Sequence, residues 1–256
     1  WVVVLTSGYN NSDNIAYLYF VNPKTGALLE KVATPTSSHG LTHAAAYVND
    51  YTDNTADAIY VGDLDGQLWR FDVTQPKGST GYYPVPALLA TLADSSNRAQ
   101  PITSAPLIEI HPITRKRFVL VGTGRLLDTS DVKTAAEQSF YGIIDGTAGG
   151  FVSGGATITR ADLTPLTDVL AGVNLSNTSK GWYMDLGVDT GIGVAWRLVS
   201  SPTAYNGVIA FAALLTSADA CSPSGQSRVY ALNYGTGKSV LSPSGTPYVG
   251  FDSPVT

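Results

Sequence analysis

The sequence contains little charge, and its charge balance is acidic. Charged residues make up 14% of the 256 residues, and the formal net charge is −5 at pH 7. Soluble domains usually carry about 25% charged residues. A nucleic-acid-binding surface needs clustered lysine and arginine, so this balance argues against one. No apolar run approaches the ~18–20 residues that a membrane-spanning helix requires. The hydrophobic fraction of 44% still suffices for a packed core, which excludes a wholly disordered chain.

Sulfur is almost absent, with one methionine and one cysteine. The single Cys221 excludes a thiolate metal cage and a disulfide within the chain, but it leaves open a bond to a segment outside it. The chain opens with a strand-like run from Trp1 to Leu5 and no leader sequence. We therefore expect one domain over residues 1–256 that is a piece of a longer, exported chain.

Helical periodicity is nearly absent as well. The nearest candidate, Asp131–Gln138, predicts one short surface helix. Short β-branched and aromatic runs dominate instead, separated by Gly, Pro, Asn and Asp, and this pattern is typical of all-β proteins. The runs that predict strands are Val2–Leu5, Tyr17–Val21, Ala58–Val61, Leu68–Phe71, Phe118–Val121, Phe140–Ile144, Val208–Ala213 and Val229–Leu232.

A weak internal repeat links four of these runs. Leu18–Asn22, Leu68–Asp72 and Val229–Asn233 share the pattern apolar, aromatic, any, apolar, Asp or Asn, and Tyr141–Asp145 is a degraded copy. The pattern predicts a strand that ends in an Asx-type turn. In two copies a glycine, Gly26 or Gly237, follows at equal spacing and can supply the positive φ of that turn.

Hairpins with aromatic and glycine markers indicate β-propeller blades. The four copies end at positions 22, 72, 145 and 233, whereas a blade needs about 40–50 residues. The sequence therefore predicts an all-β, modified β-propeller with about four blade cores and long inter-blade insertions. A β-sandwich with similar hairpins is the alternative.

Several segments resemble, in order, the motifs of the PilY-type type IV pilus tip and biogenesis proteins. Ala58–Asp72 is similar to the family's "YxGDLxGxLWRFD" run, and Trp1–Asn10 to its "WVVxxGxGYN" opening. The further matches are Gln100–Pro106, Gly122–Arg125 and Gln138–Ile143 for "QPITxxP", "GTGR" and "QSxYGI", then Lys180–Leu186 and Cys221–Asn233 for the last blades.

This resemblance implies a modified β-propeller that forms the C-terminal domain of a large exported protein. It implies a non-enzymatic scaffold or adhesin at the type IV pilus tip, which contacts minor pilins and supports pilus assembly and attachment to host or abiotic surfaces. The expected location is the bacterial cell surface, reached through the periplasm. It also implies Ca²⁺-linked control of extension and retraction.

The family's calcium loop precedes the "YxGDL" strand with an EF-hand-like spacing of oxygen ligands. The matching positions here are Asn49, Tyr51, Asp53, the Thr55 carbonyl and Asp57, with Asn54 at the sharp turn. Ca²⁺ prefers about six to eight oxygens, several of them carboxylates. Because Asn49 and Tyr51 replace carboxylates, we expect weak Ca²⁺ binding at most. The alternative is an Asx-rich turn with solvated side chains.

Other chemistries are less well supported. A quinoprotein-dehydrogenase-like propeller is the enzymatic alternative, but one cysteine excludes the vicinal pair of many such enzymes. A carbohydrate-binding propeller would need clustered surface aromatics, whereas Tyr82-Tyr83, Trp182 and Trp196 are dispersed.

Three motifs have both a catalytic or binding and a structural interpretation. His39 and His43 have a metal-ligand spacing, but their surroundings resemble a loop. Asp63 and Asp65 could form a carboxylate pair for glycoside chemistry, but a hairpin turn explains them better. Gly122–Arg125 lacks the Lys-Ser/Thr ending of a phosphate loop, and we expect it to turn a strand. His111, which precedes Pro112, is expected to cap a strand end.

Overall fold

The computed structural model describes residues 1–9, 11, 13–74, 86–152, 155–217, 225–241 and 248–253. Four antiparallel sheets follow one another along the chain. Blade 1 contains β1 (Val3–Thr6), β2 (Tyr17–Val21) and β3 (Leu28–Ala33). Blade 2 contains β4 (Leu41–Tyr47), β5 (Ala58–Asp63), β6 (Gln67–Asp72) and β7 (Ala87–Thr91).

Blade 3 contains β8 (Leu107–Ile110), β9 (Lys116–Gly122), β10 (Ser139–Thr147) and β12 (Gly181–Asp185), and β11 (Thr164–Pro165) pairs with β12 in parallel. Blade 4 contains β15 (Thr203–Tyr205), β16 (Val208–Thr216), β17 (Gly225–Asn233) and β18 (Tyr248–Ser253). A small hairpin of β13 (Val188–Asp189) and β14 (Val194–Ala195) lies between them in sequence.

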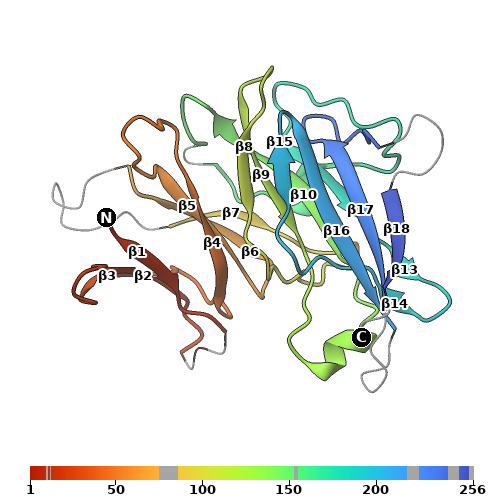
Figure 1. Ribbon diagram of the computed structural model, residues 1–256, viewed down its shortest axis with the longest axis horizontal. Coiled ribbons are helices and arrows are strands. Elements are labelled where there is room, and N and C mark those ends of the chain that lie inside the picture. The colour runs from red at the N-terminus through yellow and green to blue at the C-terminus, as the bar shows by residue number, and fades with distance from the viewer. Residues whose placement is uncertain are drawn as a thin grey trace.

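The sheets are arranged as blades of a propeller. Figure 1 shows them side by side in sequence order, with blade 1 (red) and blade 4 (blue) at opposite sides of the molecule. Consecutive antiparallel strands that pack face to face in repeated sheets are the β-propeller architecture. The predicted propeller with about four blade cores is therefore confirmed, and the described residues form an open row of blades.

Three apolar layers fill the spaces between neighbouring blades. Leu18 and Phe20 of blade 1 pack with Ile59 and Trp69 of blade 2. The next layer joins Tyr60 and Leu68 of blade 2 to Val119, Val121 and Tyr141 of blade 3, and the last joins Phe140 and Trp182 of blade 3 to Phe211 and Tyr230 of blade 4. Because successive side chains of a strand point to opposite faces, a strand such as β5 contributes to two layers and is buried along its whole length.

The sequence repeat marks the same strand in every blade. Its four copies lie in β2, β6, β10 and β17, each the second strand of the predicted hairpin. The predicted Asx turns are present: Asn22 Oδ1 accepts a hydrogen bond from Lys24 N (2.8 Å), and Asn233 Oδ1 accepts one from Gly235 N (3.0 Å). Gly26 and Gly237 close these turns at φ of +69° and +67°.

The longest connection lies within a blade. Residues 148–180 join β10 to β12 of blade 3 and carry the 3₁₀ helix η2 (Arg160–Asp162) and β11. The helix predicted at Asp131–Gln138 is instead the 3₁₀ helix η1 (Thr129–Lys133). Asp128 and Asp131 form a capping box, which starts the helix before Asp131, and the helix ends before Thr134, whose backbone is extended. No helix in the described part of the chain is long and apolar enough to cross a membrane.

Candidate functional site

The family-like motifs gather at one end of the blades. Because antiparallel strands alternate in direction, the β5–β6 turn, the connections from β7 to β8 and from β9 to β10, and the segment that leads into β15 share this end. We call it the motif end; it contains Asp63–Gly66, Gln100–Ser104, Gly122–Arg125, Gln138–Ser139 and Arg197. The residue 49–57 loop, between β4 and β5, lies at the opposite end, which we call the loop end.

Backbone hydrogen bonds at the motif end tie blade 2 to the segment that enters blade 3, and blade 3 to the segment that enters blade 4. Ile102 N donates to Asp63 O, and Leu198 N donates to Thr123 O, both at 2.9 Å. Gly62 and Gly122 precede these two acceptors, and a Cβ on either would lie 2.3–2.4 Å from the Ile102 or Leu198 side chain. The same contact therefore recurs at two blade junctions. The sequence signal is a glycine near the end of β5 and of β9, followed by Asp63 or Thr123.

The remaining motif side chains complete this scaffold. Gln100 Nε2 donates to Ser139 Oγ (2.9 Å), while Gln100 Oε1 accepts the Tyr141 hydroxyl. Thr103 Oγ1 donates to Gly124 O (2.8 Å). The Thr123 and Gly124 amides donate to the Ser139 and Pro101 carbonyls. Because these two amides are already engaged, the Gly122–Arg125 segment turns a strand, as expected, rather than cradling a phosphate.

Asp63 is a buried turn residue. Its carboxylate accepts hydrogen bonds from Ser38 Oγ (2.6 Å) and Trp69 Nε1 (3.1 Å), and from two amides of its own turn. Burial raises the pKa of Asp63, although these hydrogen bonds oppose the shift. The Asp65 carboxylate does not share these donors and pairs instead with His39 Nδ1 (2.7 Å). The structural interpretation of both carboxylates therefore fits their contacts.

The histidines also have separate structural contacts. His43 Nδ1 lies 3.1 Å from Thr103 O and shares no partner with His39. His111 Nδ1 accepts a hydrogen bond from Thr114 N (3.2 Å) in the turn after β8, which confirms the predicted cap. No group of three or more His, Cys, Asp or Glu residues that could hold a metal ion occurs among the described residues.

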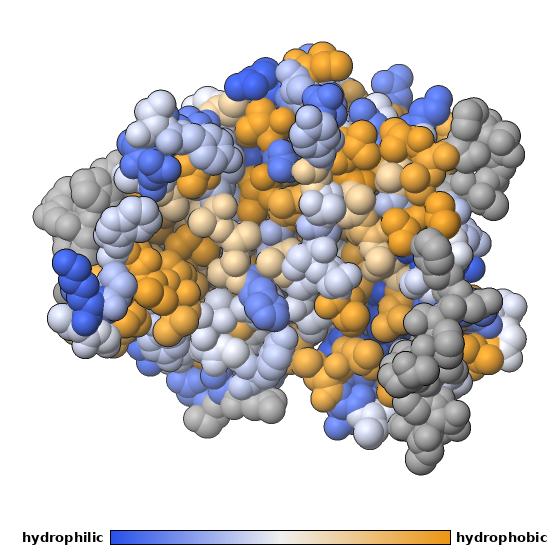
Figure 2. Space-filling view, viewed as in Figure 1, coloured by the Kyte–Doolittle hydropathy of each residue, from blue (hydrophilic) through white to orange (hydrophobic). Residues whose placement is uncertain are grey.

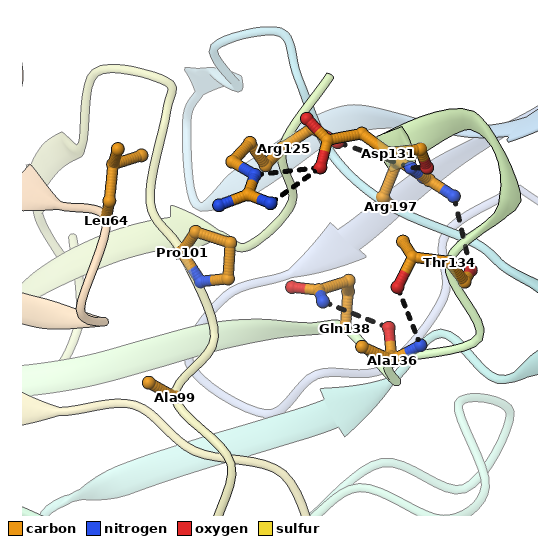
Figure 3. Close-up of a pocket in the computed structure, with 9 residues that line it drawn as sticks. All are labelled: Leu64, Ala99, Pro101, Arg125, Asp131, Thr134, Ala136, Gln138 and Arg197. Atoms are coloured by element: carbon orange, nitrogen blue, oxygen red, sulfur yellow. Dashed lines mark hydrogen bonds and ion pairs between the residues drawn. The ribbon is translucent and has the colours of Figure 1, made fainter. Parts of the chain in front are cut away.

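A pocket of about 180 Å³ opens at the motif end. Figure 3 shows its lining, which comes from blades 2 and 3 and from the segment that leads into blade 4. Arg125 donates through Nε to Asp131 Oδ1 (2.8 Å), and its Nη2 lies 2.8 Å from the same oxygen. Burial would raise the pKa of Asp131, but the hydrogen bonds from Arg125 and from two backbone amides outweigh burial and lower it. Asp131 therefore carries its charge.

Arg197 is fully buried behind this pair. Its guanidinium donates to backbone carbonyls, including those of Asp131, Arg125 (3.2 Å) and Ala195 (3.3 Å). Burial lowers the pKa of Arg197, and the charge of Asp131 partly offsets this effect. The pocket thus combines two guanidinium groups with one carboxylate. The sequence did not predict this pocket, because of its three charged residues only Arg125 belongs to a family-like motif.

The residue 49–57 loop places its predicted calcium ligands in two locations. Asp57 Oδ2 accepts the amide of Asn49 (2.6 Å), so these two residues are neighbours. Asp53 Oδ1 instead accepts the amide and hydroxyl of Thr55 (both 2.8 Å) in its own Asx turn. Asn54 has φ of +54° and takes the sharp turn, as expected.

These contacts limit how the loop could hold a metal ion. Tyr51 is 79% exposed, and Asp50 Oδ1 is bonded to Thr52. The loop has oxygen ligands of a suitable kind, but in this conformation its carboxylates do not converge on one point. The Ca²⁺ assignment therefore stays a prediction.

A second charged cluster, unforeseen from the sequence, lies between blades 2 and 3. Asp145 is fully buried and accepts hydrogen bonds from Arg70 Nη1 (2.6 and 2.8 Å) and from the Tyr60 hydroxyl (2.6 Å). Arg117, also buried, donates to Asp145 O (2.8 Å) and stacks 4.2 Å from the Phe151 ring centroid. Asp145 thus departs from the Asx-turn role of the other repeat copies.

Cys221, Tyr82 and Tyr83 lie outside the described residues, so the structure does not bear on a bond from Cys221. Trp182 and Trp196 are buried in the layer between blades 3 and 4, so neither belongs to a surface cluster of aromatic residues.

Comparison with known proteins gives consistent matches. Residues 1–176 match the family model described as the PilY1 beta-propeller domain. A type IV pilus biogenesis factor PilY1 homolog from Xylella fastidiosa is 29% identical over 245 residues, covering 93% of this chain and 19% of that protein. The type IV pilus biogenesis factor PilY1 of Pseudomonas aeruginosa is 27% identical over 283 residues, covering 93% of this chain and 24% of that protein.

A solved structure agrees with these matches. The crystal structure of the Pseudomonas aeruginosa PilY1 C-terminal domain superimposes with a TM-score of 0.73 and 25% identity, covering 93% of this chain and 56% of that one. The chain therefore spans a minor part of the two curated relatives and just over half of the solved domain.

Proposed function

Because the chain belongs to the PilY1 β-propeller domain family, we propose that it is a non-enzymatic scaffold domain that acts in type IV pilus biogenesis. The match of residues 1–176 to the family model carries this proposal, and the two relatives named as pilus biogenesis factors support it. The motif end supports the scaffold role, because its hydrogen bonds join one blade to the next.

The contacts of the polar residues favour a scaffold over an enzyme. Asp63 is bonded within a turn, the amides of Thr123 and Gly124 are engaged, and His39 and His43 are held apart. These contacts therefore favour structural roles for the three motifs over glycoside chemistry, phosphate binding and metal binding. The single cysteine also argues against a quinoprotein dehydrogenase with a vicinal cysteine pair.

We place the domain at the bacterial cell surface, at the pilus tip, where minor pilins and an attachment surface are its proposed partners. Tyr51, Ile113 and Tyr205 support this, because all three lie at the loop end and are 79–85% exposed; Tyr51 and Ile113 belong to connections, and Tyr205 is the last residue of β15. Blade 1 also exposes apolar residues, among them Leu5 and Leu28, and Figure 2 shows apolar surface over this blade. A contiguous apolar surface such as that over blade 1 is typical of protein interaction sites.

Deleting the DNA that encodes residues 1–256 from the genome of the bacterium tests the assembly role. We expect fewer surface pili by electron microscopy and less pilin in the sheared fraction, with restoration by the wild-type sequence. A substitution of the exposed residue Ile113→Ser, which leaves the blade junctions intact, should keep piliation and reduce surface attachment. Normal piliation and attachment after the deletion would contradict the proposal.

Calcium modulation is a separate proposal about the loop end. If Ca²⁺ binds, Asp53 and Asp57 must turn from their present donors toward one ion, since Ca²⁺ needs several converging oxygens. We expect a rise in melting temperature at millimolar Ca²⁺ that Asp57→Asn abolishes and that Mg²⁺ does not reproduce. No calorimetric signal and no thermal shift would exclude the site.

A further inference from the structure

The motif-end pocket contains a guanidinium group that is only partly engaged. Arg125 contacts Asp131 through Nε and Nη2, and within the described part of the chain Nη1 forms no hydrogen bond. The Arg125 side chain is 42% exposed, whereas that of Asp131 is 4% exposed. Figure 3 shows the guanidinium directed into the space between Pro101 and Gln138. One edge of its donor fork therefore faces a ligand-sized space.

Gln138 supplies an acceptor to the same space. The residue is 4% exposed, and its Nε2 donates to Ala136 O (3.0 Å). Its Oε1 is buried and has no hydrogen-bond partner among the described residues. Figure 3 shows this oxygen directed toward the space that Arg125 also faces. A buried acceptor without a partner costs about 1–3 kcal/mol, so a ligand that donates an N–H here would bind favourably.

The other walls restrict the size and charge of a ligand. Leu64, Ala99 and Pro101 form an apolar side. The volume of about 180 Å³ corresponds to roughly six water molecules at ~30 Å³ each. A cation would be repelled by Arg125 and Arg197. A fully ionised phosphate group would have no hydrogen to donate to the Gln138 oxygen, and its two negative charges would lie near the Asp131 carboxylate.

We propose that this pocket binds a carboxylate that carries an N–H donor close to it, as in a peptide. Arg125 Nη1 donates to the carboxylate, and Gln138 Oε1 accepts the N–H. An arginine fork matches a carboxylate in shape and charge, while the buried Arg197 adds positive potential. Two peptide groups have this chemistry: the C-terminal residue of a chain and an internal aspartate. The site goes beyond the scaffold role and can be tested without reference to pili.

The test is an NMR titration of the ¹⁵N-labelled chain with three small probes. N-acetylalanine represents a peptide C-terminus, N-acetylaspartic acid α-amide represents an internal aspartate, and N-acetylalaninamide lacks the carboxylate. We expect one or both carboxylates to bind with a dissociation constant on the order of 1–10 mM, in line with ligands of this size, and the amide to bind at least tenfold more weakly. The tighter of the two carboxylates identifies the source.

Two variants separate recognition from folding. Arg125→Gln removes the fork, and the nearly isosteric Gln138→Glu replaces the N–H acceptor by a carboxylate that repels the ligand. Each should weaken binding of the carboxylate probe at least tenfold while circular dichroism shows a folded chain. Arg98→Gln is the matched control, because Arg98 is likewise an exposed arginine paired with a buried aspartate, Asp94, and does not line the pocket. It should bind like the wild type.

Three results would overturn the assignment. They are equal binding of N-acetylalaninamide and the carboxylates, unchanged binding by both variants, or tighter binding of inorganic phosphate than of either carboxylate. Chemical-shift changes confined to residues outside the pocket would contradict it as well.

Discussion

Asp63 illustrates how one buried side chain can tie a turn to the connection that enters its blade. It lies in the β5–β6 turn of blade 2, where it accepts the amides of Asp65 and Gln67. It also accepts the Ser38 hydroxyl, from the connection that enters blade 2, and the Trp69 indole N–H. Because the carboxylate takes the place of the water that these four donors would otherwise bind, its negative charge stabilises this arrangement even though the group is buried.

We expect Asp63→Ala to lower the free energy of unfolding by about 2–4 kcal/mol, because several buried donors lose their acceptor. Urea denaturation followed by tryptophan fluorescence measures the change. Asp65→Ala is the control, since its contact with His39 is exposed to solvent and such pairs contribute up to about 1 kcal/mol. Equal effects of the two substitutions would argue against the buried role of Asp63.

His111 should make stability depend on pH. Its ring lies edge-on to Tyr234, with a centroid distance of 5.4 Å, and burial lowers the pKa of His111 below its ordinary 6.5. Below about pH 6.5 the unfolded chain therefore binds a proton that the folded chain resists, and stability falls as the pH falls. We expect the urea midpoint to drop between about pH 7 and pH 5.

His111→Asn provides the comparison, because asparagine can still accept the Thr114 amide but does not titrate. The variant should show a smaller drop in midpoint over the same pH interval. A drop equal to that of the wild type would assign the acid sensitivity to other groups.

At the scale of elements, the same contact occurs at two places: where β5 meets the segment that enters blade 3, and where β9 meets the segment that enters blade 4. Gly122 leaves room for Leu198, as Gly62 does for Ile102. Neither glycine has a positive φ, so an added methyl group would cost energy through overlap alone. We expect Gly122→Ala to destabilise the fold by about 1–3 kcal/mol, the usual cost of overpacking.

A double-mutant cycle with Leu198→Ala tests that cause. Leu198→Ala alone should be destabilising through the cavity it creates, but the double variant should lose less than the sum of the two single changes, because the new methyl group occupies part of the cavity. Gly150→Ala, where a Cβ meets nothing within 4 Å, should have little effect. Strict additivity would contradict the proposed overlap.

The strands that the sequence predicted share one physical property. Apart from Val2–Leu5, the predicted runs correspond to central strands of the blades, such as β5, β6, β9 and β16. These strands are either buried along most of their length or alternate between buried and partly exposed residues. Of the flanking strands, only β1 was predicted, by the run Val2–Leu5. β15 (Thr203–Tyr205), for example, is short and half-exposed. Such strands are fixed by pairing with a neighbour, and a local apolar pattern cannot reveal this.

The same distinction applies to the candidate site at the scale of the whole molecule. The local features of Asp63 and Asn54 were predictable, because a turn is determined by adjacent residues. The pocket forms where Leu64 of blade 2, the β9–β10 connection with Arg125 and Gln138, and Arg197 at the start of blade 4 come together, so it exists only when these parts assemble. Likewise, the partners of Asp145 lie 75 and 85 residues away. Residue type alone gave no sign of these contacts.

Asp145 should couple the stability of blade 2 to that of blade 3. It belongs to β10 of blade 3, whereas its partners Arg70 and Tyr60 belong to β6 and β5 of blade 2. Without its charge, the guanidinium groups of Arg70 and Arg117 would be buried with no compensating carboxylate among the residues that the structure describes. We therefore expect Asp145→Asn to cost about 3–5 kcal/mol, the usual loss when a buried ion pair is broken from one side.

Hydrogen exchange measured by mass spectrometry shows whether this loss is shared between the blades. Peptides from β5–β6 and from β9–β10 should lose protection together in Asp145→Asn, because a cluster that joins two sheets makes them open as one unit. Asp185→Asn is the control: Asp185 also pairs with an arginine, Arg160, but its side chain is 32% exposed. That variant should change protection only near β12. If Asp145→Asn exposed blade 3 alone, the cluster would stabilise one sheet rather than couple two.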